Sequence, residues 1–186
     1  DLLSRHDVIH FSCHGTCDFY DPLKNCLKLA VGSEFTVRDA IDAIKRQRRL
    51  AILSACSVGI PGSAIPDEVV GFPGSLLEAG FQGVIAPLWP VSAKATLLLL
   101  TRFYDCWRGD RLDPRIALRN AQKWLRDTTN AEKRNYFARI SAESDKRSTL
   151  AKRLVSIMDE PIQLQGPHSR SFSAPFWWAA FQYVGV

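Results

Sequence analysis

The first half of the chain contains three short, mainly apolar runs. The runs are 8–12, 50–53 and 83–86. Each run is long enough for a buried strand but too short for a buried helix. We therefore predict three core strands, with a weak fourth strand near 27–29 inside an otherwise loop-like stretch from 16 to 33.

Helical periodicity separates these runs. Apolar residues recur at helical spacing from 36 to 48, and Thr36 is a suitable N-cap. A second helix is predicted from Asp67, as its cap, to about Glu78, where Gly80 ends it. The other strong helical patterns cover 92–107 and 113–126.

The last third of the chain is less regular. Residues 128–173 are polar and partly helical in pattern, and they are the best candidate for an insertion. Residues 175–186 are apolar, and the segment is predicted to end in a last core strand. Strands that alternate with helices predict an α/β fold, a mostly parallel sheet with helices on both faces. A chain of 186 residues, 46% of them hydrophobic, suits one core, so we predict a single domain over 1–186.

The charge of the chain gives no specific indication that it binds nucleic acid or a membrane. The net charge is +5, with basic residues gathered at 45–49 and between 133 and 153. Cations suit the end of a helix, and we interpret both stretches as solvated faces rather than nucleic-acid contacts. No apolar run is long enough to cross a bilayer, so we expect no membrane partner.

The cysteines indicate a reducing compartment. They are odd in number and irregularly spaced: Cys13, Cys17, Cys26, Cys56 and Cys106. The first residues lack the layout of a signal peptide, so free thiols in a cytoplasmic protein are expected. Because the chain begins at Asp1 without an initiator methionine, we expect it to be a C-terminal fragment of a larger protein.

Two predicted strands end in residues that suit nucleophilic catalysis. One ends in a loop at Cys13-His14-Gly15 and the other at Cys56. If the two strands are neighbours, His14 and Cys56 face one crevice beyond their carboxyl ends. An imidazole can activate a thiol, and the backbone N–H groups of Gly15 and Cys56 are candidate oxyanion donors.

Other interpretations of these residues stay open. A cysteine at a strand end is often a small buried hydrophobe. Cys13, His14, Cys17 and Cys26 could form a zinc site, but no paired C-x2-C spacing supports it. His10 fits a core histidine better than a second catalytic group. A nucleotide-binding domain is poorly supported because no glycine-rich phosphate loop is present. We expect no cofactor and no metal.

Several motifs together resemble one known family. They are 10–15 (HFSCHG), 53–57 (LSACS), 67–72 (DEVVGF), 78–81 (EAGF), 86–91 (APLWPV) and 175–185 (PFWWAAFQYVG). This set, in this order, resembles the CHAT domain, the caspase-like peptidase domain associated with tetratricopeptide repeats and related to caspases and separases. The motifs extend over nearly the whole chain.

The resemblance implies a fold, a chemistry and a partner. The fold would be a caspase-like three-layer sandwich. The chemistry would be a peptidase dyad, with His14 as base and Cys56 as nucleophile, acting on a protein substrate. The partner would be an N-terminal repeat region that senses a signal or holds the substrate.

The sequence also departs from the family pattern. After 86–91, relatives commonly carry acidic residues, whereas this chain has Ser92-Ala93-Lys94, so the resemblance gives no Arg or Lys preference at the cleavage site. Candidate substrate-binding residues are Asp67, Glu68, Trp89 and Ser92. Relatives often reach the closing aromatic motif sooner, so 128–173 could cover the site, bind a partner or be neutral.

Two hypotheses about function follow. The first is a cysteine endopeptidase that works through a thioester intermediate. The second is a catalytically dormant adaptor or interaction module with the same fold. They differ in whether Cys56 is activated by His14.

Overall fold

The computed structural model describes residues 5–16, 22–43, 47–54, 72–90, 92–143, 153 and 155–186. The chain divides into two compact units. The first unit comprises residues 1–91 and 180–186, and the second comprises residues 92–179. Each unit is described by itself below.

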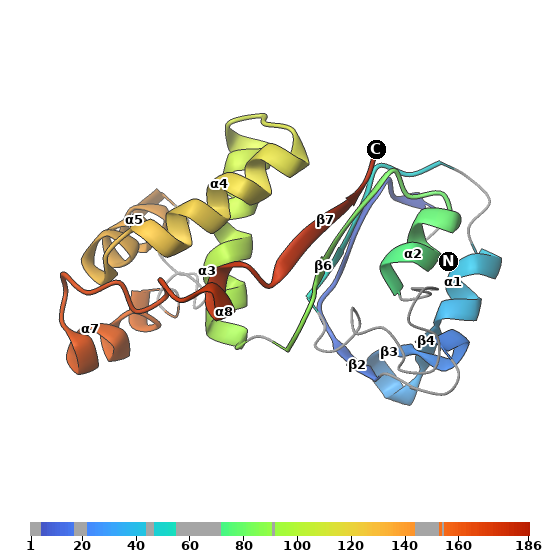
Figure 1. Ribbon diagram of the computed structural model, residues 1–186, viewed down its shortest axis with the longest axis horizontal. Coiled ribbons are helices and arrows are strands. Elements are labelled where there is room, and N and C mark those ends of the chain that lie inside the picture. The colour runs from blue at the N-terminus through green and yellow to red at the C-terminus, as the bar shows by residue number, and fades with distance from the viewer. Residues whose placement is uncertain are drawn as a thin grey trace. The chain divides into compact units, whose positions relative to one another are not determined.

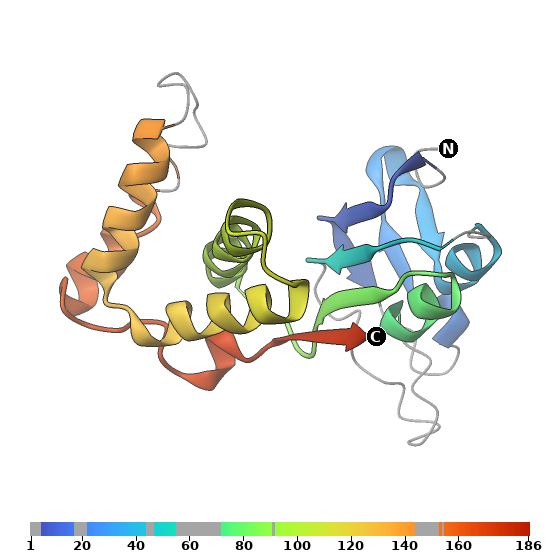
Figure 2. The ribbon, with the colours of Figure 1, turned by 90° about the horizontal axis from the view of Figure 1, so that it is seen from above.

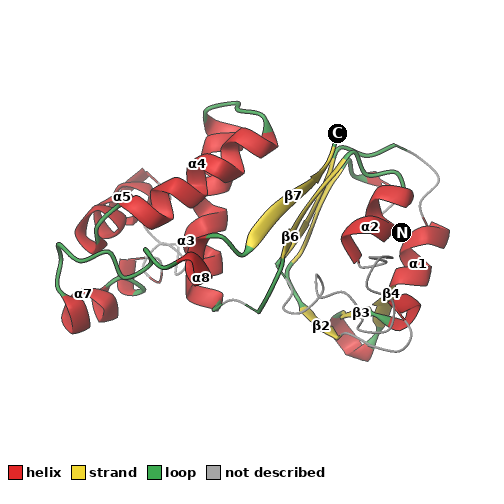
Figure 3. Cartoon of the chain, in the orientation of Figure 1, coloured by secondary structure: helices red, strands yellow, loops and turns green. Residues whose placement is uncertain are grey.

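The first unit is built on a four-stranded sheet (Figures 1 and 3). Its strands are β1 (Val8–Phe11), β5 (Leu50–Leu53), β6 (Gly83–Pro87) and β7 (Phe181–Gly185). They lie in the order β1-β5-β6-β7, which Figure 2 shows from above. The first three strands are parallel and β7 is antiparallel to β6. All four predicted core strands are therefore confirmed, in a mixed sheet of mostly parallel strands.

The central strands β5 and β6 are buried along their whole length. This explains their continuous apolar sequence, because a strand whose residues are all buried needs no polar alternation.

A second, three-stranded antiparallel sheet follows β1. It contains β2 (His14–Thr16), β3 (Cys26–Lys28) and β4 (Glu34–Thr36), with the 3-10 turns η2 (Pro22–Lys24) and η3 (Ala30–Gly32) between them. The predicted weak strand is β3. The loop predicted after β1 is wrong at 14–16, where β2 pairs with β3, and the strand β4 at 34–36 was not predicted.

Helices α1 (Val37–Ala43) and α2 (Phe72–Glu78) lie on the same side of the four-stranded sheet (Figure 1). Buried residues of both helices share one core with the sheet, including Val37 and Ala40 of α1 and Phe72 and Leu76 of α2. The predicted cap of α1 is confirmed: the Thr36 hydroxyl accepts from the backbone N–H of Asp39 at 3.0 Å.

Gly80 ends α2 as predicted. Its φ of 97° is in the left-handed region that a residue with a Cβ rarely adopts. The N–H of Phe81 donates to the carbonyl of Leu76 and the N–H of Gly80 donates to the carbonyl of Leu77. These two bonds form a Schellman motif, which satisfies carbonyls at the end of the helix.

The second unit is helical. It contains α3 (Ala93–Tyr104), which continues into a π-helical turn, η4 (Asp105–Gly109), and α4 (Pro114–Asp127). It also contains α5 (Asn130–Glu143), α7 (Asp159–Gln165) and α8 (Pro175–Trp178). The helical patterns predicted over 92–107 and 113–126 are confirmed; Ser92 and Asp113 cap α3 and α4, and Pro114 occupies the first turn of α4.

The fold class agrees with the prediction at the level of a mixed α/β protein. Within the first unit, α1 and α2 cover one face of the sheet. The caspase-like three-layer sandwich stays a prediction. Among the helices that the structure describes, none has a stretch both long enough and apolar enough to cross a lipid bilayer.

Candidate functional site

The carboxyl ends of β1 and β5 lie side by side. The two strands pair in parallel with Phe11 opposite Leu53. The backbone N–H of Ser54 extends the pairing by donating to the carbonyl of Phe11 at 2.9 Å. The predicted shared crevice required these two strands to be neighbours, and they are.

A side-chain hydrogen bond joins the same strand ends. The Ser54 hydroxyl donates to the carbonyl of Phe11 at 3.2 Å. The Nε2 atom of His10 lies 3.0 Å from the Oγ atom of Ser54. Which atom donates in the His10–Ser54 bond depends on the tautomer of the His10 ring.

His10 differs from the predicted core histidine. The residue as a whole is exposed, although its ring is desolvated enough to lower its pKa. The lowered pKa favours the neutral ring.

His14 and Gly15 lie in β2, not in a loop. Gly15 is opposite Leu27 and His14 is opposite Lys28. His14 is exposed, and within the described part of the chain its imidazole has no hydrogen-bond partner. Its ring is therefore available to a group that approaches from solvent.

A row of charged residues continues from His14 across the small sheet. Lys28 is opposite His14 on one side and opposite Glu34 on the other. Residues directly opposite each other in an antiparallel pair project to the same face. Lys28 and Glu34 form an ion pair, which lowers the pKa of the Glu34 carboxyl and raises that of Lys28. This row was not predicted, because of these three residues only Lys28 lies in a predicted strand, 27–29.

An aromatic stack anchors the small sheet to the end of β1. The rings of Phe11 and Phe35 lie with centroids 5.8 Å apart and an interplanar angle of 13°. Both side chains are buried. Cys13, which links β1 to β2, packs against the same core. The position of β2, and with it that of His14, is thus fixed by core packing.

Two candidate substrate-binding residues are described by the structure. Trp89 is half-buried and lies just after β6 in the first unit. Ser92 belongs to the second unit, where its hydroxyl accepts from the N–H of Ala95 at 3.1 Å and caps α3. The other candidates, Asp67 and Glu68, and the candidate nucleophile Cys56 lie outside the described residues.

The three cysteines that the structure describes are buried or half-buried. Burial raises the pKa of the Cys13 and Cys106 thiols. The Cys26 sulfur is buried and lies 2.9 Å from the Thr16 hydroxyl. In the described ranges, no group of three or more His, Cys, Asp or Glu side chains is arranged to hold a metal ion.

Comparison with known proteins adds the family. A search of the curated proteins finds no match. The model of the CHAT domain family matches residues 1–186, the whole chain. This confirms the resemblance drawn from the sequence motifs. The chain therefore belongs to the CHAT domain family, which is related to the caspase-like cysteine peptidases.

Proposed function

We propose that the chain is a cysteine endopeptidase in which Cys56 is the nucleophile and His14 is its base. The observation that supports this most is the parallel pairing that sets Phe11 opposite Leu53. His14 and Cys56 each follow one of these two residues by three positions. Three residues of extended chain span at most about 11 Å, which limits how far either side chain can lie from the shared strand ends.

The proposed reaction uses a thioester intermediate. His14 takes the thiol proton, and the Cys56 thiolate attacks the carbonyl carbon of a peptide bond. Negative charge develops on the carbonyl oxygen, for which the N–H groups of Gly15 and Cys56 are the proposed donors. His14 then gives its proton to the departing amine as the C–N bond breaks. Water, deprotonated by His14, attacks the thioester, releases the acid and restores the thiol.

An exposed base suits a protein substrate, which must reach it from solvent. The exposed imidazole of His14 lies on the outer face of a small sheet whose position is fixed by the Phe11–Phe35 stack. Trp89 and Ser92, with Asp67 and Glu68, remain candidate substrate contacts.

A repeat region N-terminal to this domain is the proposed regulatory partner, and a cytoplasmic location is proposed with it. The chemistry needs no cofactor, because thiol and imidazole supply nucleophile and base.

Alkylation by iodoacetamide tests the dyad. Each cysteine of the full chain is followed by mass spectrometry across pH, in wild type and in His14→Ala. We expect Cys56 to react far faster than the other four near neutral pH, and to lose this advantage in His14→Ala. Cys13 and Cys106 serve as internal comparators, because burial raises the pKa of both thiols and so reduces their thiolate fraction.

His6→Ala is the matched control, because His6 is an exposed histidine that precedes β1 in the same unit. It should leave the rate at Cys56 unchanged. An unexceptional rate at Cys56 in wild type, or equal losses in the two histidine variants, would instead support the dormant adaptor.

A further inference from the structure

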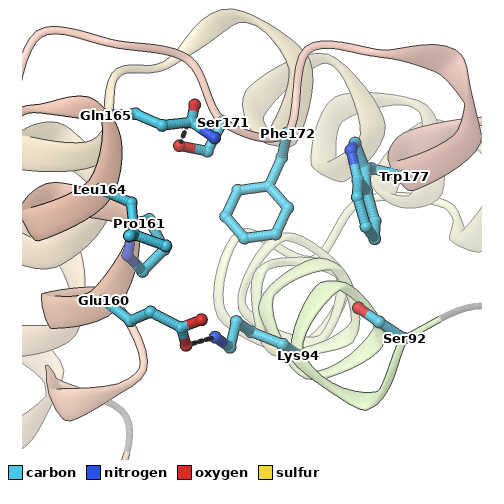
Figure 4. A pocket seen from close by; sticks show the side chains of 9 residues that line it. All are labelled: Ser92, Lys94, Glu160, Pro161, Leu164, Gln165, Ser171, Phe172 and Trp177. Carbon is cyan, nitrogen blue, oxygen red and sulfur yellow. Dashed lines mark hydrogen bonds and ion pairs between the residues drawn. The ribbon is translucent and has the colours of Figure 1, made fainter.

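The helical unit contains a pocket of about 280 Å³ (Figure 4). Its walls come from three places in the chain: the start of α3, the helix α7, and the segment from Ser171 to Trp177. Phe172 and Trp177 lie on one side, and Pro161 and Leu164 lie opposite them. The pocket is therefore walled mainly by apolar side chains.

Polar pairs close two ends of the pocket. Lys94 and Glu160 form an ion pair at one end, and the Ser171 hydroxyl donates to the Gln165 amide oxygen at the other, at 2.9 Å. These polar groups are paired with one another. A ligand would therefore gain its binding free energy mainly by burying the apolar walls.

A buried hydrogen-bond network holds the walls in place. Asn130 is fully buried, and the two hydrogens of its amide nitrogen are shared among the carbonyls of Pro161 and Gly166 and the hydroxyl of Ser171, at 3.3, 2.9 and 2.9 Å. Its amide oxygen accepts from the N–H of Ser171. One side chain thus joins α5 to both α7 and the loop before Phe172. A satisfied buried network of this kind makes a site rigid, so the pocket exists before a ligand arrives.

A buried cation lies against one wall from within. Lys133 is fully buried, and its ammonium lies 6.0 Å from the centroid of the Phe172 ring. Phe172 in turn makes an edge contact with Trp177, with centroids 5.9 Å apart. Neighbouring side chains therefore hold the aromatic wall of the pocket in place.

Size and exposure point to one inserted side chain. The volume lies just below the range of about 300–1,000 Å³ that holds small-molecule ligands. Leu164 is 74% exposed, and Phe176, whose ring centroid lies 5.0 Å from that of Trp177, is 51% exposed. These side chains extend the apolar surface beyond the pocket itself, as expected where a chain, not a compact molecule, is bound.

The net positive charge of the helical unit favours a negatively charged peptide as the ligand. Residues 92–179 carry 16 Lys and Arg against nine Asp and Glu, whereas the rest of the sequence carries eight against ten. Arg170, which precedes the pocket residue Ser171 in the sequence, is exposed, and its positive charge contributes to lowering the pKa of the Asp127 and Glu132 carboxyls. Complementary charge draws partners together and suppresses wrong ones.

We propose that this pocket binds an acidic peptide segment of a partner protein, which inserts one large apolar side chain between Leu164 and Trp177. This goes beyond the proposed peptidase chemistry and does not depend on Cys56. Part of the pocket comes from residues 128–173, which gives that stretch a partner-binding role.

Calorimetry with defined peptides tests the proposal on the full chain. The probe is acetyl-Asp-Glu-Trp-Glu-Asp-amide, with a central alanine in one control peptide and lysines in place of the acids in another. We expect the acidic tryptophan peptide to bind, and the two control peptides to bind at least roughly tenfold more weakly.

Two matched variants locate the binding. Leu164→Glu changes an exposed residue of the pocket. Ile116→Glu is the control, because Ile116 of α4 has the same size, is 52% exposed and does not line the pocket. Neither change disturbs the core. Leu164→Glu should weaken binding roughly tenfold or more, while Ile116→Glu should leave it within about twofold of wild type.

Three outcomes would overturn the proposal: no binding of the acidic tryptophan peptide, equal losses in the two variants, or equally tight binding of the lysine peptide. Binding of a single-stranded oligonucleotide with the same sensitivity to Leu164→Glu would assign the pocket to nucleic acid instead. A Cys56→Ala chain should bind the peptide as wild type does, so failure of the dyad proposal and failure of this one are distinguishable.

Discussion

His10 and Ser54 join the ends of two parallel strands through a side-chain hydrogen bond of 3.0 Å. The Ser54 hydroxyl also donates to the carbonyl of Phe11, so one oxygen contacts β1 twice. This small network lies where β5 gives way to the segment that carries Cys56.

Removal of that hydroxyl should destabilise the first unit modestly. In Ser54→Ala, His10 Nε2 and the carbonyl of Phe11 each lose a partner, although Phe11 keeps the N–H of Ser54. We expect the free energy of unfolding to fall by about 1 kcal/mol, measured in urea. Ser12→Ala is the control, because Ser12 is an exposed serine just after β1. A loss of the same size in both variants would contradict this role for Ser54.

Gly83 should not tolerate a side chain. A Cβ at this position would overlap the ring of Tyr183 on the neighbouring strand β7. Gly83→Ala should therefore lower the free energy of unfolding by about 1–3 kcal/mol. In a Tyr183→Ala background the same substitution should cost much less, because the overlapping ring is gone. Thermal unfolding of the four proteins of this cycle measures the difference, and additive effects would contradict the overlap.

Lys133 should make stability rise with pH in the alkaline range. Burial lowers its pKa from 10.5 to about 8, with Glu132, Asp127 and Arg170 as its charged neighbours. The folded protein then releases this proton before the unfolded chain does, so the free energy of unfolding should rise between about pH 8 and 10.5. Below about pH 8 both states keep the proton and this contribution is flat.

The matched variant for this effect is Lys133→Met, which keeps the length of the side chain without its charge. Urea unfolding at about pH 7 and about pH 10 should give a smaller rise, or a larger fall, in the variant than in wild type. Other tyrosines, lysines and cysteines titrate in both proteins, so the difference between them isolates Lys133. Identical pH dependence would show that burial does not favour its neutral form.

Asn130 should be among the costliest polar residues to replace. Asn130→Ala leaves the carbonyls of Pro161 and Gly166 and the N–H of Ser171 without this partner. We expect a loss of about 3 kcal/mol in the free energy of unfolding of the helical unit. Asn120→Ala, at an exposed position of α4, should change stability by less than about 0.5 kcal/mol. A small effect at both asparagines would contradict the network.

The elements with strong local signals could be predicted from the sequence. Strands β5 and β6 are apolar throughout, and Ser92, Asp113 and Gly80 mark helix ends by capping chemistry that acts within a few residues. The pairing of β1 with β5 was only a condition of the predicted site, and it is met, as is common for consecutive parallel strands joined by a helix.

Long-range pairing could not be predicted in the same way. Strand β2 has three residues, among them His14 and Gly15, and shows no alternation that would distinguish it from loop. The antiparallel direction of β7 depends on its partner rather than on its own sequence. Asn130 and Lys133 occur in a polar stretch that predicts a solvated surface, whereas the structure buries both. Their burial depends on segments some 30 to 40 residues away, such as Pro161 and Ser171.

The pairing of β6 with β7 has a consequence for the order in which the protein assembles. These strands are hydrogen-bonded neighbours, yet the whole helical unit is synthesised between them. Within that unit, Ser92 and Trp177, near its two ends, line the same pocket. Once folded, the helical unit therefore brings its own ends together and removes most of the entropy cost of closing so long a loop. We expect amides of α3 and α4 to gain protection from hydrogen exchange during refolding before those of β6 and β7 do. The opposite order would mean that the sheet closes first, around an unfolded insert.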